Sequence, residues 1–307
     1  MRGSISVSDM QARPPPSPWR DFDEATRERE YSPSSCIGGN YQAFVAAYSQ
    51  RSAQARAATP GHLNLRYGPG AAQRLDLFVP PGAAGQRAPP LLVFIHGGYW
   101  QELSKDDSSF AAPDCVRQGI AFAALDYTLA PAATVQHMVD ECTQALTWLQ
   151  AHAGAWGFDP QRMAVAGSSA GAHLAAMAAM SANPAAARAG NRCCVRAAVL
   201  VSGIYELEPL VGTSINGALA LTAHTAQAVS PALQPLAGFP PSIVCWGAVE
   251  TAEFKRQGQD FSTRLRAAGC RCDMFEVPAR NHFDVIFDLV DPATVLGAAT
   301  LALMRSL

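Results

Sequence analysis

Residues 167–171 read Gly-Ser-Ser-Ala-Gly, a G-x-S-x-G pattern with Ser169 at its centre. An apolar strand-like run, Met163 to Ala166, precedes the pattern, and an Ala-rich helical stretch follows it. In this context the two glycines permit a tight turn that holds the serine strained and exposed, at a helix N-terminus that favours negative charge. The pattern predicts that Ser169 is a nucleophile; the alternative is a tight turn made only of small residues.

A second motif, His96-Gly97-Gly98-Tyr99-Trp100, comes directly after the apolar run 91–95. Acyl transfer needs backbone N–H groups aimed at the oxyanion, and each lost donor costs roughly 3 kcal/mol of transition-state stabilisation. We assign this oxyanion hole to the N–H groups of Gly98, Tyr99 and Ala170, the last being the residue after the nucleophile. His96 heads the loop, and we expect it to brace the loop rather than to act as a base.

A base and an acid must complete this chemistry, and the chain order Ser, acid, His is typical of the elbow motif. His282 lies between a strand-like run and the last helical stretch and is predicted to be the general base. Glu250 follows the run 242–246, where a buried carboxylate can fix the imidazole tautomer, and is predicted to be the acid. Glu253 is expected one helical turn further on, pointing into solvent, and Asp260 deeper in the same helix.

Other aromatic and histidine side chains have weaker assignments. His173 lies four residues after Ser169 on the same helix face, and we expect a satisfied core histidine under the turn rather than a catalytic one. A wall for an aryl substrate is predicted from aromatic side chains near the motifs, for which core or loop packing is the alternative: Tyr99, Trp100, Tyr205 and Phe283.

The elements that must position these residues alternate between strand and helix. Short apolar runs predict strands buried on both faces at 91–95, 120–125, 163–166, 197–201 and 242–246, and an alternating run predicts a half-exposed strand at 74–79. Helical spacing predicts helices at 41–58, 139–152, 170–180, 253–268 and 290–304. This alternation indicates an α/β fold with a mostly parallel central sheet and helices on both faces.

This pattern predicts an N-terminal extension and one domain that contains a cap-like segment. Pro-rich residues 1–35 are predicted to form an N-terminal extension with a loosely packed start. Residues 36–307 are predicted to form a single domain. Residues 203–240 have fewer signals and are expected to form a small helical cap over the C-terminal edge of the sheet, where ligands bind in open α/β sheets.

Composition narrows the class of protein. The 307 residues are 49% hydrophobic and 16% charged with a net charge of −2, which suits a compact enzyme and offers no basic surface for nucleic acid. No apolar run is long enough to span a membrane, and the N-terminus lacks an apolar signal segment, so we expect a cytoplasmic protein. The eight cysteines form no C-x-x-C motif and are expected to be reduced thiols. A zinc pair at Cys270 and Cys272 is the alternative, at a spacing shorter than zinc pairs usually have.

With these residues in place, the chain resembles the kynurenine formamidase (arylformamidase) branch of the α/β-hydrolases, close to the hormone-sensitive-lipase-like esterases. The resemblance runs from residue 29 to the final helix and is carried by HGGYW with the following QELSKDD, GSSAG followed by AHL, SGIYELEPL, ETAEF and NHFDV. Lipase-like esterases usually have HGGG where this chain has Tyr99, which favours the formamidase branch. The acid of that branch is often Asp, whereas this chain has Glu250.

The resemblance implies the α/β-hydrolase fold, a triad of Ser169, His282 and Glu250, and an N-formyl aromatic amine such as N-formylkynurenine as the substrate. The predicted reaction is acyl transfer on a small molecule without a metal or organic cofactor and without a nucleic-acid or membrane partner, and a homodimer is left open. A short-chain carboxylesterase with the same triad is the alternative. A non-catalytic binding protein on this fold is a third interpretation, although such proteins usually lack a triad member.

Overall fold

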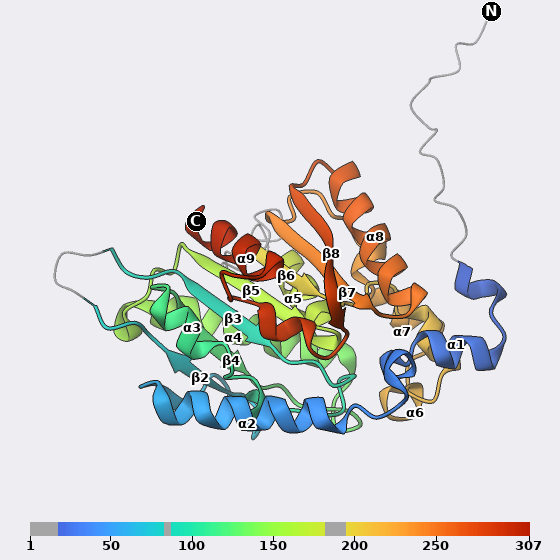
Figure 1. Cartoon of the computed structure of the whole chain (residues 1–307), viewed down its shortest axis with the longest axis horizontal. Helices are drawn as coiled ribbons and strands as arrows, with labels where there is room; N and C mark the ends of the chain where they lie inside the picture. Colours follow the sequence, from blue (N-terminus) through green and yellow to red (C-terminus); the bar gives the residue numbers. More distant parts are fainter. Residues whose placement is uncertain (1–17, 83–86, 182–194) are drawn as a thin grey trace, which may run out of the picture.

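The computed structural model describes residues 18–82, 87–181 and 195–307 (Figure 1). This part of the chain contains an eight-stranded sheet in the order β1-β2-β4-β3-β5-β6-β7-β8. Strand β2 pairs antiparallel with β1 and β4, and the remaining neighbours are parallel. The strands are β1 (His62–Arg66), β2 (Arg74–Phe78), β3 (Leu91–Ile95), β4 (Ala121–Leu125), β5 (Met163–Ser168), β6 (Val195–Val201), β7 (Ser242–Val249) and β8 (Cys272–Asn281).

The central strands are buried on both faces, as their uninterrupted apolar runs predict. All five residues of β3 and all five of β4 are buried. Along β3, Leu91, Val93 and Ile95 pack into one hydrophobic cluster, while Leu92 and Phe94 pack into another. Side chains that alternate between two cores require helices on both faces of the sheet. The predicted α/β fold and mostly parallel sheet are confirmed.

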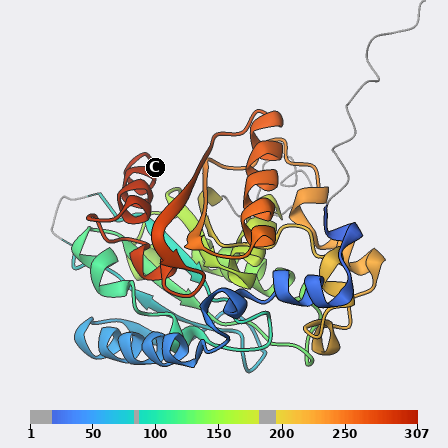
Figure 2. The ribbon, with the colours of Figure 1, turned by 45° about the vertical axis from the view of Figure 1, so that its right-hand side comes forward.

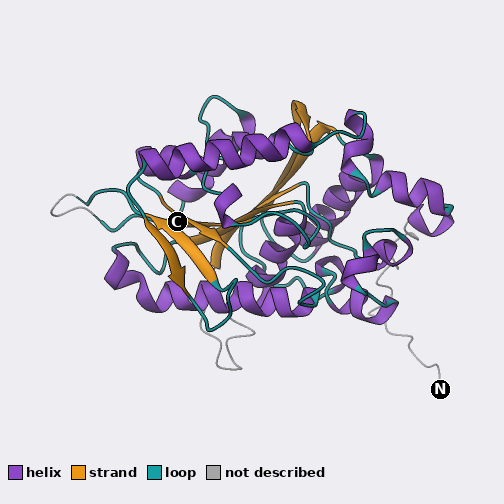
Figure 3. Ribbon diagram, turned by 90° about the horizontal axis from the view of Figure 1, so that it is seen from below, coloured by secondary structure: helices purple, strands orange, loops and turns teal. Residues whose placement is uncertain are grey.

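Helices cover both faces of the sheet (Figure 3). Side chains of α4, α5 and α8 share the first hydrophobic cluster, and side chains of α2, α3 and α9 share the second. The α-helices of the described residues are α1 (Glu24–Glu30), α2 (Gln42–Ala58), α3 (Ala112–Arg117), α4 (Val135–Trp156), α5 (Ala170–Ser181), α6 (Asn216–Leu219), α7 (Ala223–Ala228), α8 (Ala252–Ala267) and α9 (Val295–Arg305). None of them is long and apolar enough to cross a membrane.

Two helix starts differ by four residues or more from the predicted ones, and a capping residue explains each difference. Helix α9 begins at Val295 rather than at residue 290, since Thr294 caps it by accepting from Gly297 N over 3.1 Å, and Pro292 precedes the cap. Helix α4 begins at Val135, four residues before the predicted start, because the side chain of Thr134 caps it by accepting from His137 N over 3.2 Å. Strand β1 was not predicted, because its mostly exposed residues lack an apolar run.

The described part of the N-terminal extension packs against the domain from residue 18 onward, and the loosely packed start expected for this extension is not tested by these residues. Trp19 is 6% exposed and Tyr31 is 1% exposed, because both rings enter the hydrophobic core. The short elements here are the 3₁₀ helices η2 (Pro18–Asp21) and η3 (Pro33–Ile37), with α1 between them. Residues 1–17 lie outside the described residues.

Short helices also occupy the predicted cap region, residues 203–240. They are η6 (Glu208–Gly212), α6, α7 and η7 (Pro231–Leu233). Figures 1 and 2 both show α1 beside α6 and α7, so two segments far apart in the sequence lie together on one side of the sheet. The hydrogen bond from Ser214 N to Glu28 Oε2, 2.8 Å long, joins these two segments.

Candidate active site

Ser169 lies at the turn between β5 and α5. Its backbone has φ = 56°, a left-handed conformation that is strained for a residue with a side chain. The N–H of Ser169 donates to Val201 O on the neighbouring strand over 2.8 Å, and the residue is 7% exposed. The hydroxyl group therefore stands at the N-terminus of α5, on a strained turn that the sheet anchors.

Glu250 follows the last residue of β7 and contacts His282 directly. The distance from Glu250 Oε2 to His282 Nδ1 is 2.9 Å, and the carboxylate side chain is fully buried. The other oxygen, Oε1, accepts from Ser202 Oγ and from Gly247 N, each over 2.6 Å. Three donors thus surround one buried carboxylate and fix its orientation. This arrangement also assigns the Nδ1–H tautomer to His282, which leaves Nε2 free to accept a proton.

His282 lies just beyond the end of β8 and is 4% exposed. The ring of Phe254 packs edge-on against the imidazole with 4.6 Å between centroids, and Phe283 packs from another side at 5.3 Å. Tyr48 of α2 donates a short hydrogen bond to Phe283 O, which ties the loop that carries His282 (residues 282–284) to that helix. Ser169 and His282 line the same cavity of about 260 Å³.

The loop after β3 approaches the serine closely. A side chain at Gly97 would collide with Ser168 O, 2.8 Å from the Cβ position, so only glycine lets the two backbones come this near. Gly98, Tyr99 and Trp100 then have φ values of 89°, 49° and 59°. Three successive left-handed residues turn the backbone sharply beside the cavity, which Gly97, Gly98 and Tyr99 line. Ala170, the third residue assigned to an oxyanion hole, is fully buried in the first turn of α5.

His96 braces this loop, as expected. Its Nδ1 lies 2.9 Å from Gly97 O, and its ring stacks on Tyr127 with 4.3 Å between centroids. The hydroxyl of Tyr127 donates to His96 O over 3.1 Å, and Asp126 Oδ1 lies 3.6 Å from His96 Nε2. The ring is thus held among loop and core atoms.

The structure places Trp100 and Tyr205 in the core, so the predicted aromatic wall is wrong for these two residues. Trp100 is fully buried and donates its indole N–H to His173 Nδ1 over 3.3 Å. Tyr205 is 1% exposed and stacks on Phe261 with 4.3 Å between centroids. Each ring finds its partners inside the protein rather than in the cavity. Phe283 and Tyr99 do line the cavity.

His173 is a core histidine under the turn, as expected. It is fully buried, and its Nε2 lies 2.7 Å from Val229 O. Nδ1 accepts from Trp100, so Nε2 carries the proton and donates. Burial lowers the pKa of His173 to about 4, against a small opposing effect of the Val229 hydrogen bond, and the ring is neutral at physiological pH.

Glu253 is buried, so the expectation that it points into solvent is wrong. Its exposure is 2%, since Arg256 binds it through Nε at 2.7 Å and through Nη2 at 2.8 Å. Tyr31 adds a third donor, with its hydroxyl 2.7 Å from Oε2. Asp260, in contrast, is half exposed and pairs with Arg256 Nη1. Glu253 therefore neutralises a partly buried arginine and binds the N-terminal segment.

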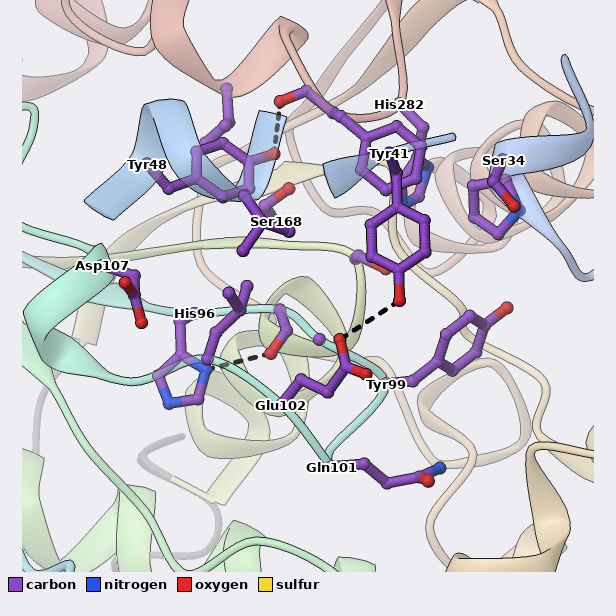
Figure 4. A pocket seen from close by; sticks show the side chains of 18 of the residues that line it. Ser34, Tyr41, Tyr48, His96, Tyr99, Gln101, Glu102, Asp107, Ser168 and His282 are labelled. Carbon is purple, nitrogen blue, oxygen red and sulfur yellow. Dashed lines mark hydrogen bonds between the residues drawn. The ribbon is translucent and has the colours of Figure 1, made fainter. Parts of the chain in front are cut away.

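Segments distant in sequence form most of the remaining cavity wall, and sequence patterns did not identify them. Figure 4 labels Tyr41, Tyr48, Ser34, Glu102 and Gln101 among the side chains that line the cavity. Three carboxylates line the cavity: Glu28, Glu102 and Asp107. The described residues contribute no lysine or arginine to its wall. The wall of the cavity therefore combines aromatic rings with negatively charged carboxylates.

The described residues hold no group of three His, Cys, Asp or Glu side chains placed to bind a metal ion. Six cysteines fall in these ranges, and none of the six forms a disulfide: Cys36, Cys115, Cys142, Cys245, Cys270 and Cys272. The suggested Cys270–Cys272 zinc pair has no third ligand among the described residues. Cys193 and Cys194 lie outside the described residues.

A mostly parallel sheet with a serine at the β5–α5 turn and a histidine beyond β8 defines an α/β-hydrolase. The BD-FAE family model matches residues 75–244. A kynurenine formamidase of Salmo salar is 31% identical over 293 residues, which cover 90% of this chain and 94% of that protein. Esterase LipQ of Mycobacterium tuberculosis is 28% identical over 74% of this chain and 57% of its own length.

Among solved structures, a candidate thioesterase of Silicibacter sp. TM1040 matches with a TM-score of 0.77 and 27% identity, covering 91% of this chain and 98% of the other. The chain belongs to the BD-FAE family of α/β-hydrolases, in the branch that includes the kynurenine formamidases and related esterases. The protein is a hydrolase of the amidase or esterase type.

Proposed function

We propose that the protein is a serine hydrolase in which Ser169 is the nucleophile, His282 the general base and Glu250 the acid that orients the base. The observation that carries this proposal is the buried Glu250–His282 pair, 2.9 Å apart, beside the cavity that Ser169 and His282 both line. Because Glu250 engages Nδ1, His282 presents Nε2 as its free proton acceptor, which is the tautomer that a general base requires.

The proposed reaction begins when Ser169 Oγ attacks the substrate carbonyl carbon and His282 takes the serine proton. The carbonyl π electrons move to oxygen, and the N–H groups of Gly98, Tyr99 and Ala170 stabilise the resulting oxyanion. His282 then protonates the leaving amine or alcohol as the bond to the acyl carbon breaks. Water, deprotonated by His282, releases the acid from Ser169 and restores the enzyme.

For the substrate we propose an N-formyl aryl amine. Support comes from the aromatic lining of the cavity, in which Tyr41 stacks on Phe283 with 5.4 Å between centroids. A flat aryl leaving group can pack against such rings. The similarity to a kynurenine formamidase of Salmo salar also favours this class.

The charges of the cavity refine this class. Glu28, Glu102 and Asp107 repel anionic groups, and the described wall supplies no cationic side chain to pair with a substrate carboxylate. We therefore propose that neutral and cationic aryl amides or esters are preferred over anionic ones. N-formylkynurenine carries an ammonium and a carboxylate, so its ammonium would face the cavity carboxylates.

A short-chain carboxylesterase of broad specificity is the second candidate. It is favoured by the similarity to esterase LipQ and by a cavity of about 260 Å³, which has room for an acyl chain as well as an alcohol. Both candidates use the same triad, so the geometry of the triad alone does not separate them.

One experiment tests the mechanism and the substrate together. Rates with N-formylkynurenine, a neutral formanilide and p-nitrophenyl acetate would be measured for the wild type, Ser169→Ala and Ser168→Ala. We expect Ser169→Ala to lose roughly 10⁴-fold or more in kcat while its circular dichroism is unchanged. If Ser169→Ala keeps a tenth of the wild-type activity, Ser169 is not the nucleophile. The ratio of kcat/KM for the formanilide and the ester separates the two candidates.

A further inference from the structure

Residues 28–34, which we call the N-terminal brace, contact two loops of the proposed site. These are residues 96–100, which we call the oxyanion loop, and residues 250–251, which we call the acid loop. The main-chain oxygen of Tyr31 accepts a short hydrogen bond from the hydroxyl of Tyr99 in the oxyanion loop. The main-chain oxygen of Glu30 accepts from Thr251 Oγ1 over 2.6 Å, and Thr251 directly follows the proposed acid. Two neighbouring carbonyl groups thus tie the oxyanion loop and the acid loop to one segment.

The brace is itself held firmly. The ring of Tyr31 is 1% exposed, its hydroxyl donates to Glu253 Oε2 over 2.7 Å, and it accepts from Gln257 Nε2 over 3.2 Å. At its other end Glu28 accepts from Ser214 N over 2.8 Å. Buried hydrogen bonds on α8 and a bond to the cap region therefore fix the carbonyl groups that the two loops contact.

The oxyanion loop needs such an anchor because of its backbone. Tyr99 has φ = 49°, a conformation in which glycine is at ease and a tyrosine is strained. Rotation of the peptide between Gly98 and Tyr99 would relieve the strain and would turn the Tyr99 N–H away from the oxyanion. A hydrogen bond from the Tyr99 hydroxyl to a fixed carbonyl opposes this rotation. Burial, with a contribution from Glu28, raises the pKa of Tyr99 far above its ordinary value, so the hydroxyl keeps its proton and remains a donor.

We infer that the N-terminal brace positions the oxyanion loop through the hydrogen bond from the Tyr99 hydroxyl to Tyr31 O, so that the Tyr99 side chain is a positioning residue for the reaction. The inference rests on the proposed acyl-transfer function. It assigns a role to a segment outside the β/α core, because the Tyr99 main chain can serve the oxyanion only while its side chain is anchored on the brace.

Tyr99→Phe tests this role, because it removes the hydroxyl and keeps the ring. Tyr67→Phe is the matched control, since it removes a hydroxyl that also donates to a main-chain oxygen, Asp126 O at 2.7 Å, and that lies outside the wall of the cavity. Both full-length variants would be assayed for kcat and KM with p-nitrophenyl acetate or the neutral formanilide, whichever the wild type hydrolyses faster. Urea unfolding gives the folded fraction, so that rates refer to folded enzyme.

The second readout is the affinity for 2,2,2-trifluoroacetophenone, an aryl ketone to which a serine hydroxyl adds. The Ser169 oxygen forms a bond to the carbonyl carbon, the π electrons become an alkoxide in the oxyanion hole, and the serine proton moves to His282. The corresponding alcohol, 2,2,2-trifluoro-1-phenylethanol, has nearly the same shape and cannot undergo the addition. It reports on ground-state binding alone.

For Tyr99→Phe we expect kcat to fall about tenfold with KM within about twofold of the wild-type value, since loosening a donor costs less than the 10²–10³-fold of losing it. Ketone affinity should fall by the same factor, and alcohol affinity should not change. Tyr67→Phe should leave kcat and ketone affinity within about twofold of the wild-type values. Equal values of kcat and ketone affinity for the two variants, or a Tyr99→Phe effect confined to KM and alcohol binding, would overturn the inference. A wild-type enzyme that neither hydrolyses these substrates nor binds the ketone would instead overturn the proposed function.

Discussion

Glu250→Gln distinguishes the proposed orienting acid, Glu250, from Glu253, its buried neighbour on α8. In the wild type, Glu250 Oε1 accepts from Ser202 Oγ and Gly247 N, each over 2.6 Å, and Oε2 faces His282 Nδ1. A glutamine at this position keeps its amide oxygen with the two donors, which places its NH₂ group against Nδ1. Two donors cannot face each other, so the imidazole must move its proton to Nε2.

With the proton on Nε2, His282 has no lone pair for the Ser169 proton. The corresponding change in another triad lowers turnover about 10⁴-fold, which is near 5 kcal/mol of transition-state free energy, while the geometry stays intact. We therefore expect Glu250→Gln to lose about 10⁴-fold in kcat, with KM and the unfolding midpoint in urea little changed. Initial rates across pH 6–9 and urea unfolding measure these quantities.

Glu253→Gln is the matched control, because it makes the same chemical change three residues away. Glu253 pairs with Arg256 and accepts from Tyr31 inside the protein, so its neutral variant leaves a buried guanidinium only partly compensated. We expect a loss of about 1–3 kcal/mol in the free energy of unfolding. The value of kcat per folded molecule should not change, because the glutamine oxygen can still accept from the Tyr31 hydroxyl and keep the brace in place. Small and equal kcat losses in both variants would refute the assignment of Glu250. A large kcat loss confined to Glu253→Gln would transfer the orienting role to Glu253.

Three further outcomes can be measured. The pKa of His173 is 6.5 in the unfolded chain and about 4 in the folded chain, so the free energy of unfolding should have its full value above pH 6.5 and fall by up to about 3 kcal/mol as the pH drops to 4. Urea unfolding should show a smaller fall for His173→Gln, and an equal fall in the variant and the wild type would contradict this expectation. Among phenyl acetates with para ammonium-methyl, methyl or carboxylate groups, kcat/KM should decrease in that order by about threefold per step and converge in 0.5 M salt, whereas a preference for the carboxylate would argue against the charge of the cavity. Thiol titration of the denatured, unreduced protein should find nearly all eight cysteines, and two or more disulfides would instead indicate an oxidising compartment.

The sequence predicted the parts of the site that depend on short-range patterns. The turn at Ser169 could be identified because a strand, two glycines and a helix occur within about twenty residues, and φ = 56° at the serine is the strain that this pattern implies. Glu250 and His282 were identified from their places after strand-like runs, and the structure brings them to 2.9 Å. Strand ends lie at one edge of a parallel sheet, so position along the chain predicts position in space.

The same approach could not assign the direction of side chains. Trp100 adjoins the proposed oxyanion loop, yet its indole turns inward to His173, and Glu253 turns inward to the hydroxyl of Tyr31 rather than toward water. Both directions depend on a buried partner that lies far away or on another element. Local propensity ranks Glu in a first helical turn as a surface residue, and only a tertiary partner reverses that ranking.

The cavity wall shows where short-range patterns stop being informative. Tyr48 lies in a predicted helix that Tyr41 precedes as the N-cap residue. Nothing in the spacing of this helix indicates that its start would reach the loop that carries His282 and that Tyr41 would stack on Phe283. The brace at residues 28–34 follows a Pro-rich start that suggests loose packing, and yet Tyr31 is as buried as a core residue. At position 99 this chain has a tyrosine where lipase-like esterases usually have a glycine, and the left-handed backbone of this tyrosine carries strain that its own loop does not relieve. The tyrosine itself therefore indicates that another segment binds its side chain. A left-handed, bulky residue in an oxyanion loop thus points to an anchor elsewhere in the chain, and here the hydroxyl of Tyr99 finds it on Tyr31.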